Sequence, residues 1–181
     1  MQGINRIVNI PSLFVLLGSL LAGCGASKQM EAAIVWPPPP DEPRIKYVQS
    51  YYNEDQFKSG SIAGKEGGIQ LQRPFDVCVD SAGDVIVSDI ESGVVVFDEV
   101  NKEVRVLGEK SSIELKRTLG IACSNEAIFV GVVGIGQVVA LSFDGSAIRT
   151  YGRPGQFPNP VDVAYDWKQK RVVVVDNKIH Q

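Results

Sequence analysis

The sequence predicts an all-β domain built from repeated four-stranded antiparallel units. Three observations support this prediction. Helical periodicity is nearly absent after residue 44, short runs rich in Val and Ile recur between clusters of Gly, Asp and Asn, and these runs return at a regular spacing. Aliphatic runs bounded by turn-forming residues are typical of strands joined by tight turns.

The first 23 residues read as an export signal. Arg6 supplies a positive charge, and residues 13–21 form an apolar run of nine residues. A transmembrane helix needs about 20 apolar residues, whereas the core of a signal peptide is shorter and precedes small residues at a cleavage site. Residues 21–24, Leu-Ala-Gly-Cys, resemble the lipobox of bacterial lipoproteins. The alternative is an ordinary secretory peptide that contains a cysteine.

The lipobox resemblance implies that Cys24 is acylated and becomes the first mature residue. Several acyl chains, at about 0.8 kcal/mol per buried CH₂, would attach the chain stably to membrane lipid. Gly25 stands where lipoproteins retained at the inner membrane usually have Asp. The resemblance therefore implies a lipid-anchored protein of the cell envelope, at the outer membrane if the host is Gram-negative.

Residues 24–43 are expected to form a proline-rich tether. Small and polar residues lead into Trp36 and four consecutive prolines, Pro37–Pro40. Consecutive prolines favour polyproline II, which makes such a segment a semi-rigid spacer. The alternative is a polyproline ligand for an aromatic groove.

Residues 44–181 contain the repeat. Residues 73–80 align with residues 159–166, and residues 117–124 fit between them; Pro74 and Thr118 are 44 residues apart, and Thr118 and Pro160 are 42 apart. The two complete copies continue with three further aliphatic runs each, and the last copy with one. Four strands at this period are typical of the blades of a β-propeller. The prediction is a partial β-propeller of about two and a half four-stranded antiparallel blades.

These repeats resemble the NHL-repeat family, whose blades combine a proline, an acidic residue, alternating aliphatic residues and a glycine turn. Residues 73–98 match this pattern best, and the resemblance covers about 110 residues. It implies a six-bladed propeller. The middle copy departs from the pattern at Gly120 and Ser124, where the family prefers acidic residues, which leaves its turn chemistry open.

The number of copies is too small to close a ring. The sequence ends where the third strand of a blade would begin, and residues 44–50 are expected to form an outer strand whose partner is missing. We expect a truncated reading frame of a longer propeller lipoprotein; an open half-propeller completed by another chain is the alternative. Unpaired strand edges predict poor solubility of the mature chain.

Composition and the polar residues narrow the function. A net charge of −3 offers no basic face for phosphates, so nucleic acid is not an expected partner. Six aspartates close strands, and we expect their carboxylates to accept hydrogen bonds from turn amides; they are Asp80, Asp89, Asp98, Asp144, Asp166 and Asp176.

Cys78 and Cys123 lie in the first strands of adjacent copies but one position out of register. Their side chains should therefore point to opposite faces, and two buried free thiols are expected. The alternative is a disulfide, which an exported compartment would permit. His180 is the single histidine, so a zinc site built from several imidazoles is not possible within this chain. Residues 131–136 are rich in glycine but are expected to form a turn between strands, which argues against a dinucleotide site. No cofactor, metal site or catalytic set is predicted.

The expected function is that of a binding or scaffolding module at the cell envelope, with a protein, peptide or glycan as ligand. The alternative is a fragment of a propeller enzyme, similar to lactonases, esterases or lyases, whose catalytic residues lie in missing blades.

Overall fold

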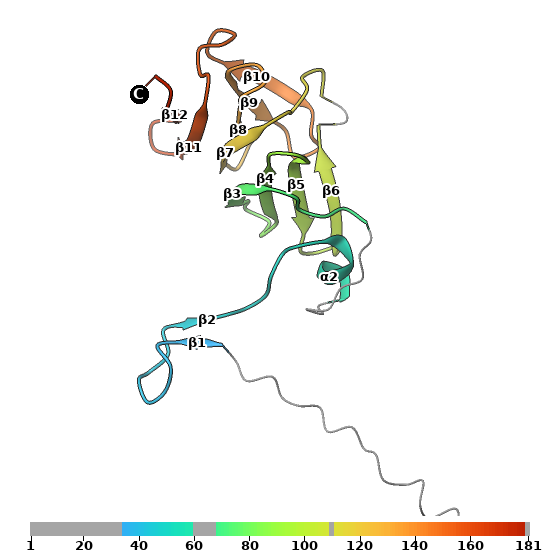
Figure 1. The fold of residues 1–181 in the computed structure, drawn as a ribbon, viewed down its shortest axis with the longest axis vertical. Coiled ribbons are helices and arrows are strands. Elements are labelled where there is room, and N and C mark those ends of the chain that lie inside the picture. Colours follow the sequence, from blue (N-terminus) through green and yellow to red (C-terminus); the bar gives the residue numbers. More distant parts are fainter. Residues whose placement is uncertain (1–33, 60–67, 109–110, 180–181) are drawn as a thin grey trace, which may run out of the picture. The chain divides into compact units, whose positions relative to one another are not determined.

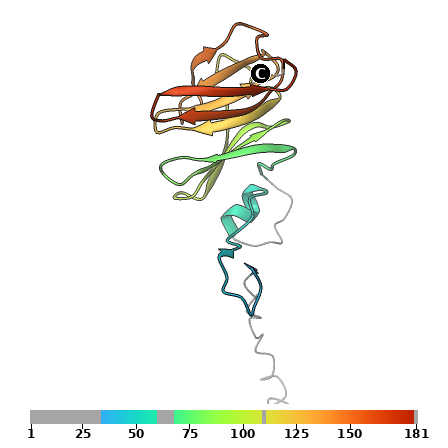
Figure 2. The same ribbon diagram turned by 90° about the vertical axis from the view of Figure 1, so that its left-hand side faces the viewer.

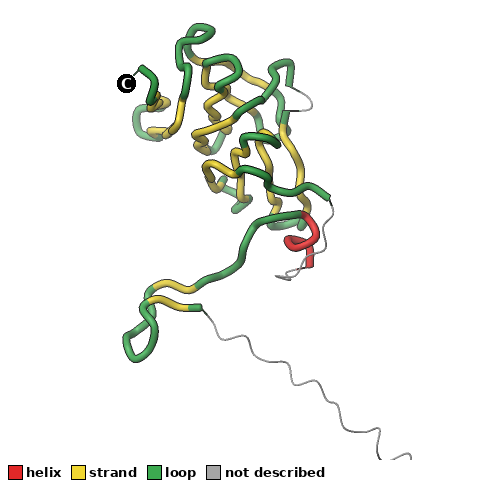
Figure 3. Tube along the Cα trace, viewed as in Figure 1, coloured by secondary structure: helices red, strands yellow, loops and turns green. Residues whose placement is uncertain are grey.

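The computed structural model describes residues 34–59, 68–108 and 111–179, and strands dominate it (Figures 1 and 3). The chain divides into two compact units, residues 1–48 and 49–181. The signal segment, Cys24 and His180 lie outside the described residues. Within those described, no helix has the length and apolar character needed to cross a bilayer.

In the first unit, β1 (Val35–Trp36) pairs with β2 (Ile45–Lys46) in a short antiparallel hairpin, and Pro37–Pro40 lie in its loop. The expected outer strand at residues 44–50 was therefore wrong in its extent and its partner. Only Ile45 and Lys46 are extended, and they pair with a strand from within the expected tether rather than with a blade.

The described residues of the second unit form three antiparallel sheets and one helix. Sheet 1 has the order β3-β4-β5-β6, sheet 2 the order β7-β8-β9-β10, and sheet 3 consists of β11 and β12. The strands are β3 (Pro74–Val79), β4 (Val85–Asp89), β5 (Gly93–Asp98), β6 (Glu103–Leu107), β7 (Thr118–Cys123), β8 (Ile128–Val132), β9 (Gln137–Leu141), β10 (Ala147–Tyr151), β11 (Pro160–Asp166) and β12 (Arg171–Asp176). The expectation of four-stranded antiparallel units is confirmed for the two complete copies.

The short helix α2 (Glu54–Ser59) was not expected from the sequence. Asn53 caps it, because its side-chain oxygen accepts a hydrogen bond from the Gln56 amide at 2.8 Å. Phe57 packs with Leu71 against Val95 and Phe97 of sheet 1. A helix of six residues is too short to show a hydrophobic period, so only its packing reveals it.

The three sheets lie next to one another, with sheet 2 between the other two (Figure 2). Ile86 and Val94 of sheet 1 pack against Val130 and Val139 of sheet 2. On its other face, sheet 2 uses Phe129 and Ala140 to contact sheet 3. Sheet 2 is therefore covered on both faces. Because side chains alternate between the two faces along a strand, every position of its strands can be buried. This explains its continuous apolar strands, such as β9, which is buried throughout.

Polar contacts also join sheet 1 to sheet 2. The Ile121 amide of β7 donates to the Asp76 carboxylate of β3 at 2.9 Å. The Thr118 hydroxyl lies 2.9 Å from the carbonyl oxygens of both Asp89 and Gly93 and can donate its proton to either. Thr118 is fully buried, so these bonds fix how the first strand of one sheet sits on its neighbour.

Cys78 and Cys123 form a disulfide that joins β3 to β7, with their Cα atoms 5.7 Å apart. The expectation of two free thiols was therefore wrong. Their offset by one position was correctly identified: Cys78 pairs across the ladder with Ile86, and Cys123 with Ile128. When two sheets stack, however, the upper face of one lies against the lower face of the other. Side chains that point to opposite faces of sheets 1 and 2 can therefore meet between the sheets, and the offset brings the two sulfur atoms together.

Candidate binding pocket

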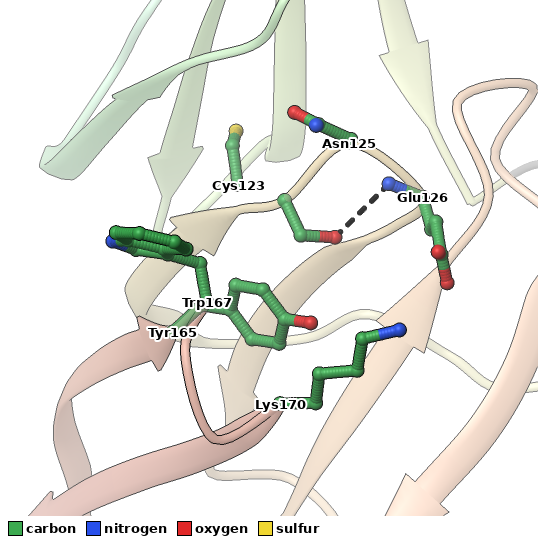
Figure 4. A pocket seen from close by; sticks show the side chains of 7 residues that line it. Cys123, Asn125, Glu126, Tyr165, Trp167 and Lys170 are labelled. Atoms are coloured by element: carbon green, nitrogen blue, oxygen red, sulfur yellow. Dashed lines mark hydrogen bonds between the residues drawn. The ribbon is translucent and has the colours of Figure 1, made fainter.

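The candidate site lies between two turns, the β7–β8 turn of sheet 2 and the β11–β12 turn of sheet 3. It is a cavity of about 530 Å³ (Figure 4). Its lining comprises Cys123, Ser124, Asn125, Glu126, Tyr165, Trp167 and Lys170. The cavity thus lies beside the disulfide and combines aromatic, amide and charged side chains.

The β7–β8 turn is held by Ser124. Its hydroxyl oxygen accepts hydrogen bonds from the amides of Glu126 at 3.1 Å and Ala127 at 2.9 Å. In sheet 1, Asp80 does the same for the amides of Ala82 and Asp84. The departure at Ser124 from the repeat pattern therefore preserves the turn, and it leaves the side chains of Asn125 and Glu126 exposed.

The β11–β12 turn is held by Asp166. One carboxylate oxygen accepts hydrogen bonds from the amides of Lys168 and Gln169, both at 3.1 Å, and the other accepts a hydrogen bond from Arg171 Nε at 3.0 Å. The bond from the Gln169 amide, together with that from Arg171, lowers the pKa of Asp166. Its charge is therefore committed to the turn, whereas Trp167 and Lys170 project from that turn into the solvent around the cavity.

Two aromatic residues line the cavity in different ways. Tyr165 stacks on Phe129 of sheet 2, with ring centroids 5.2 Å apart and an interplanar angle of 13°. Trp167 is 72% exposed, and Lys168 Nζ lies 5.3 Å from the centroid of its ring. Packing of the core therefore fixes the tyrosine ring, while the indole has no role in the core.

Apart from the Ser124 hydroxyl, the polar side-chain groups of the cavity are not used by the fold. Within the part of the chain that is described, the side chains of Asn125, Glu126 and Lys170 and the Tyr165 hydroxyl have no hydrogen-bond or ion-pair partner. Figure 4 shows the Lys170 side chain extending toward the side of the cavity that Glu126 occupies. These groups are free to hydrogen bond a ligand.

A second hollow, of about 570 Å³, shares Glu126, Tyr165 and Lys170 with this cavity. Its other walls are largely apolar and include Phe129, Tyr151, Phe157, Val172 and Val174. The shared residues therefore separate a polar cavity near the turns from an apolar one between sheets 2 and 3.

The six strand-closing aspartates do not form a site of their own. Each accepts at least one hydrogen bond from a backbone amide of its own turn, as expected. Across residues 34–59, 68–108 and 111–179, no three His, Cys, Asp or Glu side chains are grouped so that they could hold a metal ion. The turn expected over residues 131–136 is confirmed for residues 133–136, whereas Gly131 and Val132 belong to β8.

The pocket residues were not identified from the sequence. Trp167 carries the one signal that could have found them, because it interrupts the polar run from Asp166 to Lys170 at the tip of an expected hairpin. The second turn, with Asn125 and Glu126, lies about 40 residues away in sequence, and only the stacking of sheets 2 and 3 brings it close.

Comparison with protein-family models and with curated proteins gives no match. The proposal of a function therefore depends on the residues that line the pocket and on their geometry.

Proposed function

We propose that this chain is an exported lipoprotein, anchored to a bacterial membrane through acylated Cys24, whose sheets are blades of an NHL-type β-propeller that binds a ligand at the cell envelope. The pocket between the β7–β8 and β11–β12 turns carries the proposal of binding, because the polar groups of Asn125, Glu126, Tyr165 and Lys170 serve neither the turns nor the core.

The disulfide supports export. Structural disulfides form and persist in oxidising compartments and are rare in the cytoplasm. Cys78 and Cys123 are both partly buried between two sheets and close a loop of 45 residues, which is typical of a structural link. An exported chain with this link fits the lipoprotein signal that residues 1–24 predict.

Repeated contacts support the assignment of the sheets as blades. In sheet 1, one carboxylate oxygen of Asp76 accepts a hydrogen bond from the amide of Val77 at 2.8 Å. The other oxygen accepts a hydrogen bond from the amide of Ile121 in the next sheet. Asp162 of sheet 3 has the same position in the repeat and accepts the Val163 amide at 2.8 Å. Its second oxygen is available for the next sheet of a propeller.

The outer face of sheet 3 supports the same assignment. Val173 and Val175 are each 46% exposed, although their counterparts in sheet 1, Ile86 and Ser88, are buried against sheet 2. Val77 and Val79 of sheet 1 are also exposed, at 55% and 57%. Further blades of the same kind would cover both apolar surfaces.

The anchor is tested by expressing the full chain in a bacterium in the presence of a labelled fatty acid. We expect label in the wild-type chain and its recovery with membranes, and neither for Cys24→Ser. Cys78→Ser serves as the matched control, because it removes a cysteine without touching the lipobox. Label that persists in Cys24→Ser would contradict the proposed anchor.

The binding role is tested by fluorescence. The chain has two tryptophans, so Trp36→Phe leaves Trp167 as the single indole reporter. We expect a detergent extract of the host's cell envelope to change the emission of this variant saturably. No change at any extract concentration would contradict a binding role for the pocket.

A further inference from the structure

We infer that the cavity between the β7–β8 and β11–β12 turns binds an uncharged, hydroxyl-rich ligand, that is, a neutral saccharide. The inference rests on the proposed binding function and specifies its ligand. It uses three properties of the cavity: an accessible indole, several uncommitted polar groups, and a balanced charge.

The indole provides a flat apolar surface. Trp167 is 72% exposed at the tip of a turn, and exposing so large an apolar ring gains nothing for the fold. Exposed tryptophan and tyrosine are enriched at binding sites, since they offer large contact area with few rotatable bonds. The C–H groups on one face of a pyranose ring match such a surface, because they carry partial positive charge and the aromatic face is negative.

The polar groups match hydroxyl groups. Asn125 offers a donor and an acceptor, Glu126 two acceptor oxygens, Lys170 three donor hydrogens and Tyr165 a hydroxyl that does both. A hydroxyl also donates and accepts, so each of these groups can bond a sugar without a change of protonation. The turn bonds of Ser124 and Asp166 fix the backbone of the two turns from which Glu126 and Lys170 project before any ligand binds.

The charge of the lining argues against ionic ligands. Glu126 is its one carboxylate and Lys170 its one ammonium group, so the lining has no net charge. A phosphate or acidic peptide would meet Glu126 at short range, and a basic peptide would meet Lys170. A neutral ligand avoids both repulsions and still uses both groups as hydrogen-bond partners.

The test uses the full chain in detergent with Trp36→Phe as the background. The probes are two neutral tetrasaccharides, chitotetraose and maltotetraose, and one anionic tetrasaccharide, tetragalacturonate. We expect at least one neutral probe to change Trp167 emission saturably, and tetragalacturonate to bind at least about tenfold more weakly.

Variants locate the binding by a second method, isothermal titration, which needs no tryptophan. We expect Trp167→Ala to weaken binding of the neutral probe at least about tenfold and Trp167→Phe to retain more of it, because a phenyl ring keeps part of the stacking surface. Glu126→Ala should weaken binding severalfold. Its matched control is Glu114→Ala, which removes a carboxylate that is exposed but does not line the cavity.

The outcomes separate this inference from the proposed function. Unchanged affinity in Trp167→Ala, or tighter binding of tetragalacturonate than of either neutral probe, overturns the inference. If the envelope extract changes Trp167 emission while neither neutral probe binds, the saccharide inference is wrong and the binding function stands. If neither the extract nor the probes act, both are wrong.

Discussion

At the scale of single residues, Asp89 shows how one side chain organises several segments. One of its carboxylate oxygens accepts hydrogen bonds from the amides of Gln72 and Arg73, at 2.8 Å each. The other accepts hydrogen bonds from the amides of Glu91 at 2.9 Å and Ser92 at 2.8 Å. It is fully buried at the end of β4. Burial acts to raise the pKa of Asp89, but the four amide bonds outweigh it and the pKa is lowered.

We expect Asp89→Asn to lower the free energy of unfolding by about 1–3 kcal/mol, because the amide NH₂ group cannot accept the bonds that the lost oxygen received. Urea denaturation followed by circular dichroism measures this change. Asp98→Asn is the matched control, since Asp98 makes the same kind of turn bonds at the surface. Equal losses in the two variants would contradict a special role for the buried carboxylate.

The lowered pKa of Asp89 also predicts that the stability of the folded chain falls as the pH is lowered. An ordinary aspartate in the unfolded chain titrates at about pH 4. The contribution of Asp89 is therefore complete above that pH and is lost as the pH falls through its lower pKa in the folded state. Stability of the wild type should fall more steeply below about pH 4 than that of Asp89→Asn.

At the scale of elements, the junctions between sheets are made in two different ways. Between sheets 1 and 2, side chains bridge the gap, as Asp76 does to β7. Between sheets 2 and 3, the backbones approach directly. A Cβ atom on Gly120 would lie 2.4 Å from Asp162 Cα, and one on Gly131 would lie 2.7 Å from the Pro160 carbonyl oxygen. Glycine is therefore required where β11 lies on sheet 2.

We expect Gly120→Ala to separate β11 from β7 and to lower the free energy of unfolding by more than about 3 kcal/mol, because the clash is with backbone that cannot rotate away. Gly83→Ala is the control. Its Cβ would meet nothing within 4 Å, and its φ of +92° should cost only about 1–2 kcal/mol. Thermal denaturation compares the two, and a milder effect at Gly120 than at Gly83 would show that β11 can shift freely.

At the scale of the whole molecule, the disulfide adds a second covalent link between sheets 1 and 2, beside the chain that connects β6 to β7. It closes 45 residues of sequence. Cross-links of this kind stabilise mainly by restricting the unfolded chain, by about 2–4 kcal/mol for loops of this order.

Reduction should lower the melting temperature, and the double variant Cys78→Ala/Cys123→Ala should melt at the same lower temperature with or without reductant. Calorimetry measures both, and alkylation before and after reduction counts the thiols. Cys24→Ser controls for the loss of a cysteine elsewhere. If the oxidised wild type had the same melting temperature as the double variant, the disulfide would have no stabilising role.

Local chemistry made much of this fold predictable. The alternation of aliphatic residues, the aspartates and Gly83 sufficed to place the ten strands of the three sheets, because strand and turn formation depend on neighbours in sequence. The role of Ser124 could have been foreseen for the same reason. The strand expected at residues 44–50 was misjudged, since the pairing partner of an isolated segment with strand-like alternation is not encoded in the segment itself.

The sequence by itself determined the repeat, the order of strands and the aspartates that hold six of the turns, since all of these follow from short-range backbone geometry. Only the tertiary structure decided which surfaces meet. Stacking turns opposite faces of neighbouring sheets toward each other, and it is this long-range arrangement that joins Cys78 to Cys123 and brings Glu126 beside Tyr165 and Trp167.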